Sequence, residues 1–101
     1  MLRKPRKVAS ILEQLAKTYT DAQLEHYARS GVHEFIVRLA TLRHVVDFTD
    51  DLLKEKDPAD IADIVIAVVD RAAMESLPVH FMVRSDNFDT VLRAQRKLVR
   101  H

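Results

Sequence analysis

The side chains of this chain that could do acid–base or metal chemistry near neutral pH are its five histidines. None of them belongs to a metal motif that spacing alone reveals. His33-Glu34 is not followed by a histidine three residues after the glutamate, so the zinc-protease pattern is absent. No Glu-x-x-His sequence occurs either, which removes the signature of a di-iron helical bundle.

The closest constellation is formed by His44, Asp47 and Asp51. On a helix, the spacing i, i+3, i+7 would place these residues on one face, where they could bind a divalent metal with ligands from a second helix. A helix face rich in carboxylates is more often simply solvated. We therefore predict no metal site and no cofactor.

Other catalytic machinery is also missing from the sequence. The chain has no cysteine, which excludes a thiolate nucleophile, a disulfide and a cysteine–zinc site. Its one glycine is too few for a loop that cradles phosphate. The serines at positions 10, 30, 76 and 85 fall at predicted helix ends or on the surface. The sequence predicts a protein that is not an enzyme.

The composition is that of a globular domain. A chain of 101 residues, 48% hydrophobic and 31% charged, is expected to fold as one helical domain over 1–101. No apolar run reaches the roughly 20 residues of a membrane span. The basic start is followed by Ser10, Glu13 and Lys17 instead of the apolar stretch of a secretion signal. Together with the missing cysteines, this predicts a cytoplasmic protein.

The net charge is only +1, but the charges are unevenly distributed. Residues 1–7 hold four cations and no anion, whereas residues 47–63 hold seven acids against two lysines. We expect residues 1–6 to form a flexible basic arm. The other end of the chain is also basic, and its cations could contact the phosphates of a nucleic acid: Arg93, Arg96, Lys97 and Arg100.

The scarcity of glycine favours helices, because tight hairpin turns usually need glycine. Apolar spacing and capping residues predict an all-α fold of five helices: 5–19, a short helix between Thr20 and Ser30-Gly31, 32–56, 58–76, and a last helix capped by Ser85 or Asp86. Residues 79–84 are rich in strand-forming residues and are the one strand candidate.

The helices predicted at 32–56 and 58–76 carry more apolar surface than one small monomer should be able to cover. We expect them to form a long central antiparallel pair, each with an apolar arc of roughly 200°, about twice that of an ordinary surface helix. The surplus predicts a homodimer, whose interface we place at Ile61, Ile64, Val65, Val68, Val69, Val79 and Phe81. The apolar face left for a different partner protein would contain Val37, Val45, Phe48 and Leu52.

A lone strand at 79–84 would leave its backbone N–H and C=O groups unpaired. It could pair across a dimer axis or join the sheet edge of a partner. It could equally be an extended connector that hydrogen-bonds to water. His80 alternates with Val79 and Phe81 and is expected on the outer side of the strand.

These features predict a small non-catalytic regulatory protein that acts by protein–protein binding, as an adaptor, inhibitor or antiactivator. In size and predicted helical character the chain resembles the antiactivators that bind bacterial transcription regulators. That resemblance implies a transcription regulator as the partner. The alternative is a dimeric nucleic-acid-binding regulator that uses the basic last helix and the N-terminal arm.

Overall fold

The computed structural model describes residues 6–99 of the chain, with side chains for residues 6–93. In chain order the elements are helix α1 (Arg6–Thr18), strands β1 (Gln23–Arg29), β2 (Val32–Leu39) and β3 (Leu42–Thr49), helices α2 (Asp50–Glu55) and α3 (Pro58–Met74), strand β4 (Val79–Val83) and helix α4 (Phe88–Val99). The strands form one sheet in the order β1-β2-β3-β4. The first three pair antiparallel, whereas β4 runs parallel to β3.

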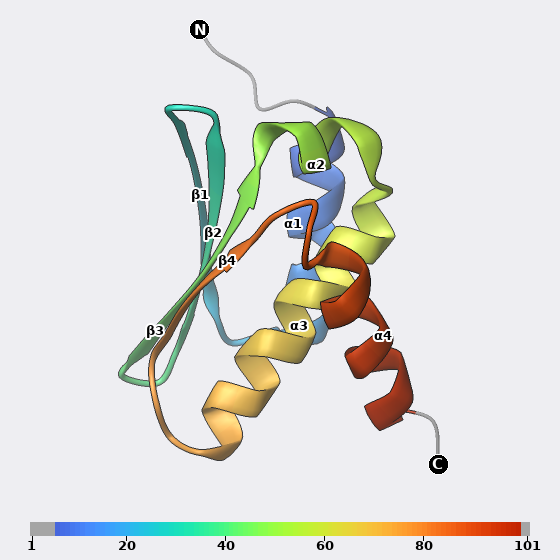
Figure 1. Ribbon diagram of the computed structural model, residues 1–101. Helices are drawn as coiled ribbons and strands as arrows, with labels where there is room; N and C mark the ends of the chain where they lie inside the picture. Colours follow the sequence, from blue (N-terminus) through green and yellow to red (C-terminus); the bar gives the residue numbers. More distant parts are fainter. Residues whose placement is uncertain (1–5, 100–101) are drawn as a thin grey trace, which may run out of the picture.

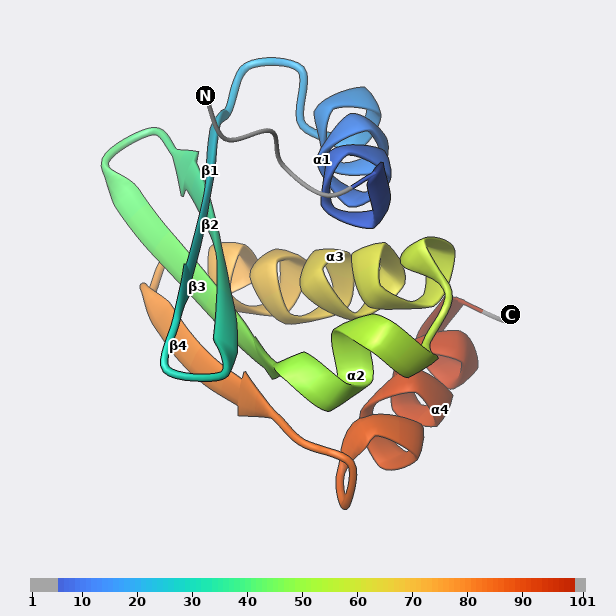
Figure 2. The same ribbon diagram turned by 90° about the horizontal axis from the view of Figure 1, so that it is seen from above.

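The described residues form two layers, a twisted sheet and a layer of helices (Figure 1). Seen from above, the helices all lie on one side of the sheet, with α3 crossing behind it (Figure 2). Helix α3 contacts β2, β3 and β4, and α1 and α4 pack against α3. The other face of the sheet is not covered by any helix of the described residues.

The all-α prediction is wrong, because the described chain combines a four-stranded mixed sheet with four helices. The helices expected at 5–19 and 58–76, the last helix and the strand at 79–84 are confirmed by α1, α3, α4 and β4. The helices expected between Thr20 and Gly31 and over 32–56 are not formed. That stretch contains β1, β2 and β3, and only Asp50–Glu55 is helical. Residues 6–99 contain no long antiparallel pair of central helices.

The error has its origin in strands that are apolar on both faces. Phe35 of β2 and Val46 of β3 are paired and belong to the core beneath the helices. Their chain neighbours Ile36 and Val45 are also paired, point to the opposite face and are equally buried. Consecutive buried residues hide the two-residue alternation of a strand, and on a helical wheel they imitate a helix that is apolar on two sides.

Helix α3 is covered on most of its circumference within a single copy. Asp57 precedes it in an extended conformation, and Pro58 fits its first turn, where no backbone N–H is needed. Its buried side chains join those of α1 and the sheet in one hydrophobic core. The apolar excess predicted for 58–76 is therefore largely used inside the monomer.

Both hairpins are closed by two-residue turns that use left-handed backbone. Ser30 and Gly31 have φ angles of 50° and 76°, as in a type I′ turn, and Ala40 begins the second turn with a φ of 53°. Gly31 was expected to end a helix, but it closes the β1–β2 hairpin, and its carbonyl accepts the Asp50 N–H at 2.8 Å. Because Ala40 takes up a left-handed conformation without being glycine, the scarcity of glycine does not exclude a sheet.

Replacement of Gly31 by alanine is expected to lower the free energy of unfolding by about 1 kcal/mol. A Cβ atom at this position would meet nothing within 4 Å, so the cost comes from the positive φ alone. Urea denaturation of the wild type and of Gly31→Ala measures the difference. Thr41→Ala, at an exposed turn position without positive φ, is the control and should change stability by less than about 0.5 kcal/mol. Equal stability of Gly31→Ala and the wild type would contradict the turn geometry.

Candidate functional site

The four residues predicted to bind a partner protein lie inside one copy of the chain. Val37, Val45, Phe48 and Leu52 are at most 2% exposed. Val37, Phe48 and Leu52 belong to the core between sheet and helices, and Val45 is buried on the opposite face of the sheet. In this fold they present no surface to another protein.

The residues predicted for the dimer interface divide into two groups. One group is buried in the core of the monomer: Ile61, Ile64, Val65 and Val69. The other group is only partly buried and lines a single groove: Val68, Val79 and Phe81. Part of the predicted interface is thus accessible, and the rest is interior.

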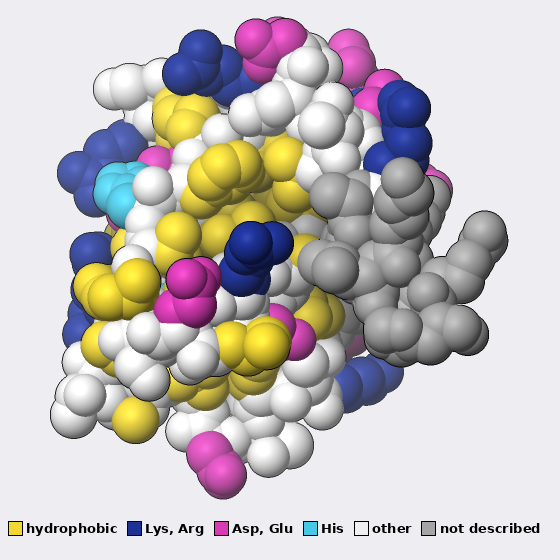
Figure 3. All heavy atoms as spheres, turned by 60° about the horizontal axis from the view of Figure 1, so that its bottom comes forward, with side chains coloured by type: hydrophobic (Ala, Val, Ile, Leu, Met, Phe, Trp, Pro, Cys, Tyr) yellow, Lys and Arg dark blue, Asp and Glu magenta, His cyan; other side chains and the backbone are white. Residues whose placement is uncertain are grey.

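This groove lies between the C-terminal half of α3 and the start of β4. Its volume is about 320 Å³, and its mainly apolar wall contains Val68, Arg71, Ala72, Glu75, Leu77, Pro78, Val79 and Phe81. Figure 3 looks onto this end of the molecule, where apolar side chains gather with charged side chains among them. Beside the groove, Met74 is 87% exposed, and Leu77 on its wall is 55% exposed. The apolar members of this region are termed the α3–β4 surface: Val68, Ala72, Met74, Leu77, Val79 and Phe81.

The way α3 ends determines the shape of this surface. Ser76 has a φ of 55°, and its N–H donates to the Ala73 carbonyl at 3.0 Å. The Leu77 N–H donates to the Ala72 carbonyl, also at 3.0 Å. These two bonds form a Schellman motif, in which the residue after the left-handed position packs on the last helical turn. The motif turns the chain back toward β4 and places Leu77 and Ala72 on the same groove.

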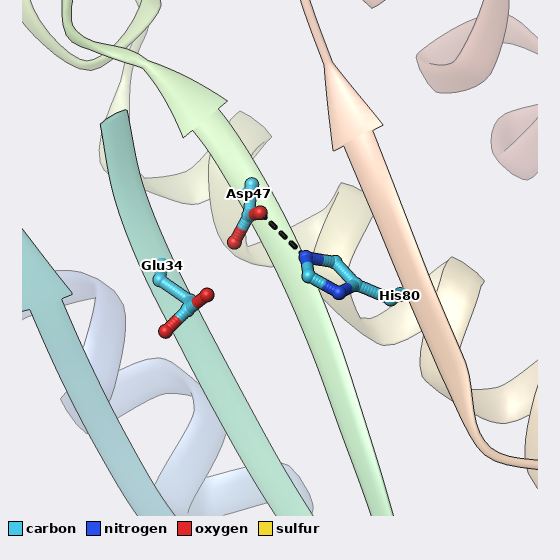
Figure 4. Close-up of side chains that lie close together, drawn as sticks. All are labelled: Glu34, Asp47 and His80. Carbon is cyan, nitrogen blue, oxygen red and sulfur yellow. Dashed lines mark hydrogen bonds and ion pairs between the residues drawn. The ribbon is translucent and has the colours of Figure 1, made fainter. Parts of the chain in front are cut away.

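A second candidate site lies on the sheet face that no described helix covers. Glu34 of β2 and Asp47 of β3 are directly paired, and His80 of β4 lies beside them (Figure 4). His80 Nε2 is 2.7 Å from Asp47 Oδ2. One potential metal-ligand atom of each residue lies within 4.8 Å of the others. These three residues are termed the carboxylate–histidine cluster.

The structure separates the constellation predicted from spacing. His44 pairs with Val37 on the core side, Asp47 points to the opposite face of the sheet, and Asp51 lies on α2. Only Asp47 belongs to the cluster. The exposed position of His80 agrees with its expected place on the outer side of the strand. The contacts of Glu34 and His80 with Asp47 depend on strand register, which spacing along the chain does not reveal.

A chain of hydrogen bonds connects the first hairpin to α2. His26 Nε2 is 3.0 Å from His33 Nδ1, and His33 Nε2 is 2.9 Å from Asp50 Oδ1. Lys54 Nζ lies 2.9 Å from the other oxygen of Asp50. The hydrogen bond from His33, and then that from Lys54, holds the pKa of Asp50 below its ordinary value. We assign these two histidines to anchoring the start of α2.

The residues predicted to contact nucleic acid fall mostly outside the described side chains. Arg93 on α4 is exposed. The side chains of Arg96 and Lys97, and the whole of Arg100, lie outside the described residues. So do residues 1–5 of the predicted basic arm, whereas Arg6 begins α1. Nucleic-acid binding stays a prediction.

No family model matches the chain, and no curated protein or solved structure is significantly similar to it. None of the helices described for residues 6–99 is long and apolar enough to cross a membrane. The function is therefore inferred from the surfaces themselves.

His44 is a polar side chain within the interior. Its exposed fraction is 0%, and neither ring nitrogen has a hydrogen-bond partner among the described residues. Burial disfavours the charged imidazolium and lowers the pKa of His44 below its ordinary value. His44 is therefore a buried imidazole whose neutral form is favoured by its surroundings.

The lowered pKa of His44 predicts a pH-dependent stability. In the unfolded chain the imidazole takes up a proton as the pH falls through about 6.5, whereas the buried ring, whose pKa is lowered, takes up its proton only at a lower pH. The unfolded state then binds more protons than the folded state, so the free energy of unfolding should decrease as the pH falls from about 8 to about 5. Urea unfolding of the wild type and of His44→Leu across this range measures the effect. The variant should lose part of the slope, and an identical slope in both proteins would contradict the burial of a neutral ring.

Proposed function

We propose that this protein is a small non-catalytic regulatory protein that acts by protein–protein association in the cytoplasm. Its first partner is a second copy of itself, bound through the α3–β4 surface. The observation that carries the proposal is an apolar groove flanked by Met74 and Leu77, which are 87% and 55% exposed. The cytoplasmic location rests on the absence of cysteine.

Apolar side chains in water favour association when a matching surface is near. Full burial of a methionine or leucine side chain contributes roughly 1.5–3 kcal/mol. Tyr27 is the other large apolar side chain exposed among the described residues, and it lies on β1, away from Met74 and Leu77. At the α3–β4 surface, by contrast, protruding apolar side chains adjoin a groove that could receive them.

The charged side chains along the groove of one copy are complementary to those along the same groove of a second copy. Arg71 and Glu75 both line the groove, are both exposed, and lie four residues apart on one face at the end of α3. A two-fold axis that passes between these two side chains would set two α3 helices antiparallel and place Arg71 of one copy opposite Glu75 of the other. This self-complementarity favours a second copy over an unrelated protein as the occupant.

Side-chain packing, and not strand pairing, is the proposed mode of association. β4 already pairs with β3, so it needs no partner strand to satisfy its backbone on that side. Its other edge is only five residues long and is preceded by Pro78. On β4, the Met82 carbonyl already accepts a hydrogen bond from the Asn87 side-chain amide at 3.2 Å. Short edges flanked by proline are poor sites for strand addition.

Light scattering of the full chain over a range of concentrations should reveal a monomer–dimer equilibrium. Substitution of both Met74 and Leu77 by serine is expected to weaken self-association at least about tenfold, the equivalent of about 1.4 kcal/mol of lost apolar burial. Tyr27→Ser is the matched control, since it removes an exposed side chain outside the surface. It should leave the equilibrium unchanged. A monomer at every concentration would refute the dimer.

Charge reversal tests whether the occupant is a second copy in the two-fold arrangement. Arg71→Glu should weaken the dimer because it places an acid opposite Glu75 of the other copy, and Glu75→Arg should do the same with two cations. The doubly reversed variant restores opposite charges across the axis and should recover much of the wild-type affinity. A double variant as weak as either single variant would exclude this pairing.

A further inference from the structure

The carboxylate–histidine cluster is built by three neighbouring strands. Strand pairing sets Glu34 directly opposite Asp47, and the parallel strand β4 brings His80 to within 2.7 Å of the same aspartate. The three side chains lie close together on one face of the sheet (Figure 4). Because each donor stands on a regularly paired strand, the sheet holds the set in place, which suits a binding site.

The two carboxylates are an unfavourable pair unless a cation lies between them. Like charges directly opposite each other on neighbouring strands repel. Asp47 is only 6% exposed, and its Oδ1 atom is fully buried without a hydrogen-bond partner among the described residues. A buried carboxylate oxygen that accepts no hydrogen bond loses its hydration without compensation.

The cationic groups around the cluster do not compensate the charge of the two carboxylates. Arg29 approaches Glu34 at 3.5 Å, and its side chain is 73% exposed. His80 reaches Asp47 only at Oδ2. The other oxygen of Asp47 lies on the side of Glu34, away from the imidazole (Figure 4). The negative charge that lacks a cationic partner therefore lies between the two carboxylates, next to the histidine.

We propose that this cluster binds a divalent transition-metal ion of the zinc type, through one oxygen each of Glu34 and Asp47 and one ring nitrogen of His80. Imidazole nitrogen combined with carboxylate oxygen suits Zn²⁺, whereas Mg²⁺ and Ca²⁺ take oxygen ligands. In a tetrahedral site, ligand bonds of about 2.0–2.2 Å set two donors on one ion roughly 3.4 Å apart. The three donors lie within 4.8 Å of one another, so rotations of the side chains would bring them to this spacing.

The inferred ion has fewer protein ligands than a closed structural site. Structural zinc sites are typically closed by four protein ligands, whereas sites with three keep a position for water or another ligand. The His80 side chain is 63% exposed, and no described helix covers this face of the sheet. The remaining coordination position therefore faces solvent and is accessible to water or a small anion.

This site is independent of the proposed dimer. On β4, Val79 and Phe81 line the groove on the helix side, whereas His80 between them points to the opposite face. Loss of metal binding would leave the α3–β4 surface intact, and the two inferences can fail separately.

Isothermal titration calorimetry of the full, untagged chain with ZnCl₂, after treatment with EDTA, tests the proposal. We expect one ion per chain, and Asp47→Asn and His80→Gln should each lower the affinity for Zn²⁺ at least about tenfold. Glu25→Gln is the matched control, because Glu25 lies on the same sheet face but is already paired with Arg38 at 3.0 Å. It should bind Zn²⁺ as the wild type does, and MgCl₂ should give no comparable binding.

The site would be overturned by the absence of zinc binding to the wild-type chain, or by equal binding of zinc to the wild type and to His80→Gln. The His80 variant keeps the test decisive if Asp47→Asn fails to fold, because the His80 side chain is largely exposed. Circular dichroism of each variant verifies the fold before titration. Weakening by Glu25→Gln as large as that by His80→Gln would also overturn it, since that result would indicate diffuse attraction by a charged face.

The Co²⁺-loaded protein tests the open coordination position. The visible absorption of the bound Co²⁺ should be lost or altered in His80→Gln, which removes the nitrogen ligand. Addition of azide should change the spectrum of the wild type if a position faces solvent. A spectrum unaffected by azide would overturn the open position while leaving the metal site in place.

Discussion

The structure depends on the burial of one sheet face by α3. Phe35 and Phe48 meet edge to face on adjacent strands, with ring centroids 5.9 Å apart, and α3 packs over the sheet that carries them. Such aromatic pairs add to the stabilisation from apolar burial. α1 and α4 both rest on α3, so their positions follow from the same contact. The groove also follows from it, because it forms where α3 leaves the sheet beside β4.

The helices that flank the sheet were predictable from the sequence, and the sheet itself was not. α1 is amphipathic, and α3 begins at a proline, so periodicity and capping locate both. β4 was predicted as a strand, but β2 and β3 were taken for helix because Ile36 and Val45 are buried between residues that face the core, which removes the alternation on which strand prediction relies. The turn residues did not indicate a hairpin either, since Ala40 adopts a positive φ that is normally found at glycine.

The residues of the candidate sites could be predicted only where a pattern of neighbouring residues in the sequence indicated them. Val68 was predicted from an excess of apolar surface on a helix pair that the described residues do not form, and Val79 and Phe81 from a strand that needed a partner. Met74 and Leu77 were missed because their exposure depends on how α3 ends. The carboxylate–histidine cluster draws its members from three strands, and His80 lies 33 residues after Asp47 in the sequence. Only the register of the sheet brings them together, and register is a tertiary property.

β4 has five residues, and its side chains meet different surroundings at nearly every step. Val83 fills the core, Val79 and Phe81 line the groove, and His80 meets Asp47 on the far side. Substitutions in this strand are therefore expected to keep apolar side chains on the helix side and a polar side chain at position 80 on the other side. An insertion or deletion of one residue would exchange the two faces, sending the imidazole inward and an apolar side chain outward. Among relatives of this chain, the length of β4 should vary less than that of the loops around it.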